Sequence, residues 1–285
     1  MASADPITRI IRFESDDGNI YQGEEPDAGQ PAVVLSGNLF DGTLARTSEQ
    51  RAVHKLLSPL VPTDIFCIGL NYMRHYEESA KKRGIPLPSF PVIFMKPSSS
   101  LNGPVDNIVL PNIERGEELD WEAELTIVIG RRCKDVTKEE ALDYVLGYTV
   151  GNDVSSRHWQ KNAGAGQWIK GKSFDSFCPL GPVLVTTEAI PDPQQLSIKT
   201  RVNGAVQQDS LTSDMIFTCA QIVEFLSNNM TLLPGTVILT GTPEGVATGR
   251  DPPNWLKDGD EVEVEISQIG SLRNRVVRAP GNLAL

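Results

Sequence analysis

The chain has 285 residues, and its 26 Lys and Arg against 37 Asp and Glu give a formal net charge of −11 at pH 7. Its 40% hydrophobic and 22% charged residues are typical of a globular protein that is long enough to bury a sizeable core. The acidity argues against nucleic acid and anionic membrane surfaces as partners, and no run of about 20 apolar residues predicts a membrane span.

The first part of the chain, residues 1–60, predicts a small N-terminal domain. Two short apolar runs there predict strands and one amphipathic run predicts a helix, at 7–13, 32–36 and 47–57 respectively. Thr47 or Ser48 would cap that helix. A proline-containing stretch, 57–64, then predicts a linker to a larger domain at 65–280.

In the larger domain, predicted strands outnumber predicted helices. The Asn203-Gly204 pair between two apolar runs predicts a hairpin. The strands are expected at 66–70, 92–96, 121–130, 144–150, 196–202, 205–210, 236–241, 260–270 and 271–277. The helices are expected at 72–83, with Asn71 near the cap and Gly84 closing it, at 137–147, with a Thr137–Glu140 capping box, and at 213–230. The predicted class is α+β and β-rich.

The cysteines and histidines restrict the kinds of site. Cys67, Cys133, Cys178 and Cys219 are far apart and form no C-x-x-C pair, which favours reduced thiols in an intracellular compartment. The first residues lack the apolar core of a secretory signal, so a secreted protein is not expected. The three histidines form no H-E-x-x-H motif, and any metal would therefore be held by oxygen ligands.

Residues 166–173 match the phosphate-loop pattern G-x-x-x-x-G-K-[ST]. A working phosphate loop needs a buried strand before it and a helix after it, because the helix N-terminus binds the phosphates. No apolar strand is expected before Gly166, and Pro179 and Pro182 exclude a helix afterwards. The match therefore does not predict nucleotide binding.

An acidic segment suggests a metal site. Glu122 and Glu124 are two residues apart in a predicted strand, so their side chains lie on one face. Two partly buried carboxylates on one face need a cation between them, and Mg²⁺ prefers oxygen ligands of this kind. Asp153, after the next predicted strand, could be a third ligand. The alternatives are exposed strand carboxylates and, for Asp153, an ordinary turn residue.

Three further groups of polar residues could act on a substrate. His75 and Glu78 share one helix face and could form a general base, or only a surface contact. Arg157 and Gln160 could hold a carboxylate or a carbonyl oxygen. The loop 240–245 could bind an anion through its amides and a hydroxyl, or be an ordinary Gly/Pro turn.

Taken in order, the segments resemble the fumarylacetoacetate hydrolase family, especially its compact fumarylacetoacetate-hydrolase-domain proteins. The resemblance covers about residues 65–277, and the segments that carry it are GLNYMRHYEE, PVIFMKP, LDWEAELTIVIG, GNDVSSRHWQ, KGKSFDSFCPLGP, VNGAVQQDS, LLPGTVILTGTPEGV and LKDGDEVEVEI. It implies a mixed β-roll with a small N-terminal domain, a homodimer, and Mg²⁺ or Mn²⁺ as cofactor.

The resemblance also implies roles for residues at matching positions. The implied metal ligands are Glu122, Glu124 and Asp153; the implied catalytic residues are His75, Glu78 and Lys172; the implied substrate contacts are Arg157, Gln160 and Thr242. The chain departs from the family pattern at Ala247, where glycine is usual, and in the glycine-rich stretch 162–166. These departures leave the shape of that loop, the lid geometry and the substrate choice open.

The implied function is metal-dependent chemistry on a small anionic 2-oxo or 2,4-dioxo carboxylic acid, through an enolate stabilised by the metal. Keto–enol tautomerisation of oxaloacetate is the first choice, and acylpyruvate C–C hydrolysis and decarboxylation of oxaloacetate or another β-keto acid are the alternatives. A metal-binding module without catalysis is an alternative of another class. The expected location is the cytoplasm or the mitochondrial matrix.

Overall fold

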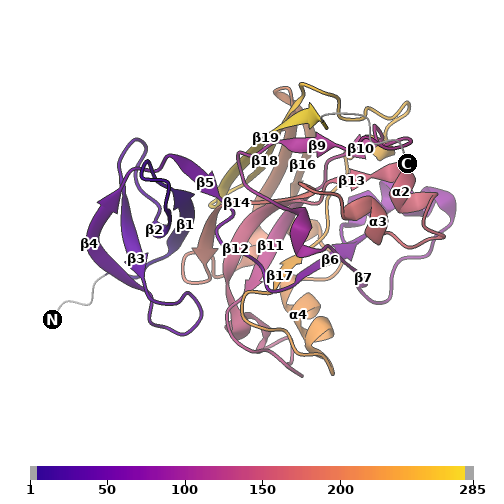
Figure 1. Cartoon of the computed structure of the whole chain (residues 1–285). Helices are drawn as coiled ribbons and strands as arrows, with labels where there is room; N and C mark the ends of the chain where they lie inside the picture. The colour runs from indigo at the N-terminus through magenta and orange to yellow at the C-terminus, as the bar shows by residue number, and fades with distance from the viewer. Residues whose placement is uncertain (1–4, 280–285) are drawn as a thin grey trace.

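The structure is a computed structural model that describes residues 5–279, and β-sheets dominate it (Figure 1). Twelve strands form the main sheet: β1 (Arg9–Glu14), β2 (Ile20–Glu24), β3 (Ala32–Ser36), β4 (Ala45–Arg51), β5 (Lys55–Leu57), β6 (Ile65–Gly69), β7 (Val92–Met95), β8 (Leu101–Asn102), β11 (Ala123–Ile129), β12 (Val145–Asn152), β14 (Cys178–Thr186) and β17 (Val237–Leu239). Five more form a second sheet: β9 (Ile108–Leu110), β15 (Ser197–Val202), β16 (Ala205–Leu211), β18 (Glu261–Ile266) and β19 (Gly270–Arg278). A small sheet pairs β10 (Leu119–Asp120) with β13 (Ser155–Ser156).

Helices are short and few in the described chain. The α-helices are α1 (Met73–His75), α2 (Arg157–Lys161), α3 (Ile169–Lys172) and α4 (Cys219–Ser227). The short 3-10 helices are Lys81–Arg83, Ser98–Ser100, Ala141–Tyr144, Pro193–Gln195, Thr212–Asp214 and Ala247–Gly249, and Tyr76–Ala80 is a π-helix. This composition confirms the predicted α+β, β-rich class.

The main sheet joins the N-terminal strands to the rest of the chain. Its order is β4-β3-β2-β1-β14-β12-β11-β17-β6-β7, with β5 on β1 and β8 on β14. The N-terminal strands lie together on the left in Figure 1, and β1 is the strand that pairs with β14, with Arg9 opposite Val185. The division between residues 1–60 and 65–280 stays a prediction.

The central strands are buried on both faces. All seven residues of β11 are buried, which explains its nearly continuous apolar sequence. One core cluster joins Leu125 and Ile127 of β11 to Ile198 of β15, Val264 of β18 and Ile222 of α4. Each such fully buried side chain contributes roughly 1.5–3 kcal/mol. The second sheet and α4 therefore fix β11 and β12, the strands next to the predicted metal ligands.

The predicted helix at 47–57 is wrong, because this segment forms β4 and β5. Thr47 does not cap a helix; its hydroxyl donates to the carbonyl of Val34 on the neighbouring strand β3. β5 pairs with β1, with Leu56 opposite Phe13. Backbone pairing with β3 and β1 thus outweighs a short amphipathic pattern.

The predicted helix at 72–83 is helical from Met73 to Arg83 but irregular, and Tyr72 instead forms an isolated bridge with Met215. The helical segment begins as α1, widens into the π-helix Tyr76–Ala80 and ends as a 3-10 turn. Gly84 closes it in the left-handed region at φ 72°, as expected. Asn71 does not cap it, since its amide instead donates to the carbonyls of Phe217 and Thr240.

Two other predicted helices are shorter than expected. Within 137–147 only the 3-10 turn Ala141–Tyr144 forms, because β12 already begins at Val145. Of 213–230 only α4 is an α-helix, capped by Thr218 and Gln221 in a capping box. The predicted Asn203-Gly204 hairpin is confirmed as β15–β16. Among residues 5–279 no helix is both long and apolar enough to cross a membrane.

Candidate active site

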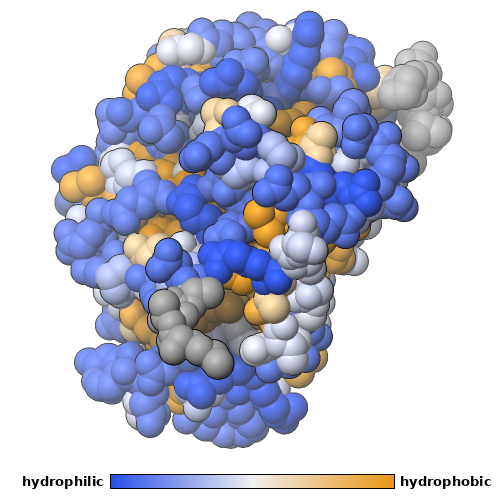
Figure 2. Space-filling view, turned by 90° about the vertical axis from the view of Figure 1, so that its left-hand side faces the viewer, coloured by the Kyte–Doolittle hydropathy of each residue, from blue (hydrophilic) through white to orange (hydrophobic). Residues whose placement is uncertain are grey.

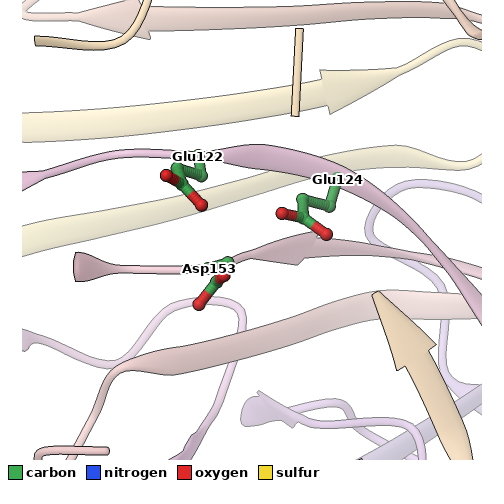
Figure 3. Close-up of side chains that lie close together, drawn as sticks. All are labelled: Glu122, Glu124 and Asp153. Carbon is green, nitrogen blue, oxygen red and sulfur yellow. The ribbon is translucent and has the colours of Figure 1, made fainter. Parts of the chain in front are cut away.

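Three carboxylates that are separated in sequence meet at the end of β11 and β12. Glu124 lies in β11, Glu122 directly precedes the first residue of β11, and Asp153 directly follows β12. The antiparallel register places Ala123 opposite Asn152, so Asp153 lies beside the two glutamates (Figure 3). One oxygen of each carboxylate lies within 4.8 Å of the others, and all three residues are buried.

Main-chain hydrogen bonds hold these carboxylates in place. The amide of Asp153 donates to the carbonyl of Glu122 at 2.9 Å, and the amide of Glu122 donates to the Asn152 side chain at 3.0 Å. The amide of Gly241 donates to Glu124 Oε2 at 2.7 Å. Gly241 has a φ of +98° and a Cβ there would lie 2.6 Å from Asn71 Cβ, so only glycine can present this amide.

Buried cations surround two of the three carboxylates. Lys172 Nζ lies 2.6 Å from an oxygen of both Glu122 and Asp153. Lys96 Nζ lies 2.6 Å from the other oxygen of Asp153 and also donates to main-chain carbonyls, among them that of Phe177 at 2.8 Å. Among the ion pairs of residues 5–279, Glu124 has no cationic partner. It is the least compensated charge of the group.

The pKa values reflect this unequal compensation. Burial opposes ionisation of Glu122, but the charges of Lys172 and Arg157 outweigh it and hold the pKa of Glu122 below its usual range. Burial, followed by the charges of Asp153 and Glu122, raises the pKa of Glu124 well above its usual value. Burial alone would lower the pKa of Lys172, yet Asp153 and Glu122 raise it. A cation beside Glu124 would offset the repulsion between its carboxylate and those of Asp153 and Glu122.

The donor set fits a hard divalent ion. Four buried carboxylates, Asp120 and the three above, are accompanied by only three buried cations, Lys96, Lys172 and Arg157. The three converging side chains offer oxygen ligands alone, which suits Mg²⁺ or Mn²⁺ and not zinc. A divalent ion would change the net charge of the cluster from −1 to +1 and make it attractive to an anion.

The predicted pair on the helical segment also faces this site. His75 Nδ1 lies 3.3 Å from Glu78 Oε2, and the Gly245 amide donates to the same carboxylate. Burial raises the pKa of Glu78, but the hydrogen bond and charge of His75 outweigh it, and the net pKa is lowered. An ionised Glu78 keeps the proton on Nδ1 and leaves the other ring nitrogen free to accept one.

The predicted substrate contacts differ in whether their hydrogen-bond donors are already engaged within the protein. All three guanidinium nitrogens of Arg157 are engaged: Nε with Asp120 at 2.7 Å, Nη2 with Glu122 at 2.6 Å and Nη1 with Gln160 at 2.9 Å. The Thr242 hydroxyl accepts a hydrogen bond from the Gln208 amide at 2.9 Å, so its own proton is free to be donated.

Of the nine predicted site residues, all except Glu78 and Asp153 line one cavity of about 270 Å³. Its apolar wall is formed by Ile68, Phe94, Trp168 and Ile85. The volume is close to the lower end of the range for small-molecule sites. The nine predicted site residues are therefore brought together at one site, and their individual roles stay predictions.

Sequence reasoning missed three residues that hold the site together. Asp120, also buried, accepts from Arg157 and from the amides of Ala247 and Thr248 at 2.7 and 3.0 Å. Lys96 ends a predicted strand in PVIFMK, and a lysine directly after such an apolar run was the available signal. Gln208 accepts from the amide of Ala123 at 3.1 Å and thereby links β16 to β11.

The structure also bears on three other sequence features: the phosphate-loop pattern, Ala247 and the cysteines. The phosphate-loop pattern contains α3 within it, and no strand precedes it, so the context for phosphate binding is absent from this part of the described chain. Ala247 begins a 3-10 helix and donates its amide to Asp120, a geometry that needs no glycine. The cysteines are buried and unpaired, and burial raises the pKa of Cys178 and Cys219 to about 12, which disfavours their reactive thiolate form.

Comparison with known proteins gives the same assignment over most of the chain. The family model described as fumarylacetoacetate (FAA) hydrolase C-terminal matches residues 64–277. The mitochondrial oxaloacetate tautomerase fahd2 of Xenopus laevis is 48% identical over 289 residues, which cover 97% of this chain and 88% of the relative. The human mitochondrial oxaloacetate tautomerase FAHD2A is 40% identical and covers 88% of this chain and 86% of its own length.

Solved structures agree with the fold. The crystal structure of 2-hydroxyhepta-2,4-diene-1,7-dioate isomerase from Mycobacterium marinum has a TM-score of 0.82 and 40% identity, covering 96% of this chain and all of its own. The fumarylacetoacetate hydrolase of Exiguobacterium antarcticum has a TM-score of 0.79 at 35% identity, covering 95% of this chain and all of its own. The chain belongs to the fumarylacetoacetate hydrolase family and is an enzyme of that family.

Proposed function

We propose that this enzyme interconverts the keto and enol forms of oxaloacetate, with Mg²⁺ or Mn²⁺ as its cofactor. The observation that carries the proposal is the buried group Glu122, Glu124 and Asp153 in one site with the His75–Glu78 pair. The relatives named as oxaloacetate tautomerases support the substrate. A cavity of about 270 Å³ suits a four-carbon acid.

The proposed roles follow from the charge or hydrogen-bond donor that each side chain can still offer to a substrate. When bound by Glu122, Glu124 and Asp153, a divalent ion supplies positive charge that stabilises negative charge on the 2-oxo acid head group. The Lys172 ammonium adds charge beside that group, and the free Thr242 hydroxyl proton is donated to a carboxylate oxygen.

The proton that moves between carbon and oxygen is assigned to His75. With Nδ1 held by Glu78, the Nε2 atom of His75 takes the proton from C3 of the keto form and gives the same proton to the 2-oxo oxygen, which yields the enol and restores the neutral ring. No bond between carbons breaks and no water is consumed. The same base acting on water would give C–C hydrolysis, so the assay must follow both.

Replacing His75 with glutamine is expected to lower kcat for tautomerisation about 100-fold or more, the range for loss of a general base. The measurement is the decay of enol absorbance with Mg²⁺ present, with pyruvate release and acetylpyruvate loss followed in parallel. His158→Gln is the matched control, because His158 lies on α2 and does not line the cavity.

An unchanged rate in His75→Gln would contradict the assigned base. If acetylpyruvate is cleaved or pyruvate is released faster than oxaloacetate is tautomerised, the enzyme is a hydrolase or a decarboxylase instead. Binding of Mg²⁺ and oxalate without turnover of any of these acids would show a metal-binding module that lacks catalysis.

We also propose that the protein is a homodimer that associates through the β7 edge of the main sheet. β7 is the last strand in the sheet order and pairs only with β6 among the described strands. Phe90, Ile93 and Met95 at this edge are 68%, 41% and 37% exposed. The face on the N-terminal side, in contrast, is largely hydrophilic with hydrophobic residues in small groups (Figure 2).

Light scattering is expected to give twice the 31.1 kDa mass of the chain. Phe90→Ser combined with Ile93→Ser should shift the mass toward a monomer, because the two changes remove apolar contact at the interface. Val206→Ser is the control on the second sheet, at an apolar residue whose 53% exposure lies between those of Phe90 and Ile93. A monomeric wild type, or a dimer unaffected by the double change, would contradict the proposed surface.

The cytoplasm or the mitochondrial matrix is the proposed location. The four buried thiols without disulfides are typical of a reducing compartment, and the named relatives are mitochondrial.

A further inference from the structure

Two cations of the cavity wall have no carboxylate partner. Lys161, the last residue of α2, and Arg83, the last residue of the 3-10 turn, both line the cavity. Lys161 Nζ donates to the Thr248 hydroxyl at 2.9 Å, and Arg83 Nε donates to the Ser79 carbonyl at 3.2 Å. Neither takes part in an ion pair with any residue between 5 and 279.

The chain offers these cations no free counter-charge. The acidic groups that attract Lys161 are Asp120 and Glu122, and both are already bound, Asp120 by Arg157 and two amides and Glu122 by Arg157 and Lys172. Although Lys161 as a residue is exposed, burial of its ammonium group, followed by the charges of Arg157 and Arg83, lowers its pKa to about 8. A second anion at this place would relieve the repulsion.

The groups around Lys161 and Arg83 indicate which type of anion would bind there. The neighbouring cavity wall is apolar at Ile85 and Trp168, so it cannot satisfy a charged group. The Thr248 hydroxyl accepts from Lys161 and therefore keeps its proton for a further acceptor. Two cations and one hydroxyl donor match the oxygens of a carboxylate.

We propose that Arg83, Lys161 and Thr248 form a subsite for a second, distal carboxylate, so that the enzyme selects 2-oxo dicarboxylic acids over 2-oxo monocarboxylic acids. The inference rests on the proposed function for the place of the 2-oxo acid head group, which binds at Glu122, Glu124 and Asp153. Because Arg83 belongs to the segment that carries His75 and Glu78, a distal carboxylate also holds this segment over the head group.

A matched pair of non-substrate ligands tests the subsite directly. Oxamate and N-oxalylglycine share the oxalyl head group, and only N-oxalylglycine has a terminal carboxylate. Titration calorimetry with Mg²⁺ present is expected to show N-oxalylglycine binding about 10-fold or more tighter to the wild type. Arg83→Gln and Lys161→Met should each reduce this ratio, and the double variant should bring it close to one, while oxamate affinity is kept.

Steady-state kinetics with oxaloacetate provide a second readout. In Lys161→Met the KM should rise about 10-fold while kcat changes less than about threefold, because the subsite binds substrate and does not transfer protons. Lys161→Arg should keep the low KM. Lys170→Met, an exposed cation on α3 outside the cavity wall, is the control and should behave as the wild type.

The pH dependence separates a charge effect from a packing effect. A lysine whose pKa is lowered to about 8 is charged at pH 7 and loses its charge as the pH rises toward 9. The charged groups that face Lys161 are Arg83, Arg157, Asp120 and Glu122. Burial opposes the charged forms of Arg157 and Glu122, but the pKa of Arg157 is raised by Asp120 and Glu122, and the pKa of Glu122 is lowered by Lys172 and Arg157, so neither of these two changes its charge in this range. The ratio of N-oxalylglycine to oxamate affinity should therefore fall over this range in the wild type and stay constant in Lys161→Arg.

Each outcome bears on one of the two proposals. An equal affinity for both ligands in the wild type, or an undiminished ratio in the double variant, overturns the subsite. The expected ratios together with no turnover of oxaloacetate would leave the subsite standing and refute the tautomerase. If neither ligand binds with Mg²⁺ present, the head-group site is wrong and the subsite inference fails with it.

Discussion

Glu124→Gln is expected to lose Mg²⁺ binding while the metal-free protein stays at least as stable as the wild type. In the metal-free protein Glu124 is buried beside Glu122 and Asp153, and burial and these charges raise its pKa. A neutral amide removes that repulsion, and its oxygen can still accept the hydrogen bond from Gly241. The same change removes one of three oxygen ligands and the charge that binds the ion.

The magnitudes can be measured separately. Substitution of a residue that hydrogen-bonds a metal ligand reduces metal affinity about 10- to 100-fold. Loss of a ligand itself should therefore reduce Mg²⁺ affinity, measured by titration calorimetry, about 100-fold or more. At 100 times its dissociation constant, the metal should add about 2.7 kcal/mol to the wild-type free energy of unfolding and nothing to that of the variant. Tautomerisation should slow about 1,000-fold, since the charge it loses is worth several kcal/mol.

Glu117→Gln is the matched control because it removes one exposed carboxylate from the same acidic segment. It should leave metal affinity, activity and the free energy of unfolding unchanged. An unaltered Mg²⁺ affinity in Glu124→Gln would mean that the ion binds elsewhere. A metal-free variant that is clearly less stable than the wild type would mean that Glu124 has a structural partner beyond Gly241.

Local sequence patterns predicted the strands better than the helices. Strands such as β11 and the β15–β16 hairpin depend on apolar runs and on an Asn-Gly turn, which are local signals. The segment 47–57 has a short pattern compatible with either structure, and the choice depended on backbone pairing with β1 and β3. The π-helix at Tyr76–Ala80 left no signal in the apolar spacing.

The site was partly predictable for the same reason. The spacing of Glu122 and Glu124 alone places both on one face, but the third carboxylate depends on the register between β11 and β12, which no local pattern gives. The position of Asp153 after the next strand made it only a possible third ligand, and the family resemblance then assigned it to the metal and supplied Lys172. Asp120 was missed because its partners Arg157 and Ala247 follow it by 37 and 127 positions.

Lys172→Met is expected to separate metal binding from catalysis. The Lys172 ammonium lies 2.6 Å from both Glu122 and Asp153, and without it the two carboxylates are buried with fewer counter-charges. Breaking a buried ion pair by removing one partner destabilises proteins by about 3–5 kcal/mol, so the metal-free variant should unfold correspondingly more easily. Lys170→Met on the same helix is exposed and should change none of these quantities.

With Mg²⁺ the stability of Lys172→Met should recover, because the ion replaces the missing positive charge at the same carboxylates. Its Mg²⁺ affinity should be at least that of the wild type, since no ammonium competes for Glu122 and Asp153, yet kcat should fall about 100-fold or more. Glu124→Gln loses metal and activity together, whereas Lys172→Met keeps the metal and loses only activity. If Mg²⁺ affinity falls in parallel with kcat in Lys172→Met, the lysine supports the metal ligands and has no direct role toward the substrate.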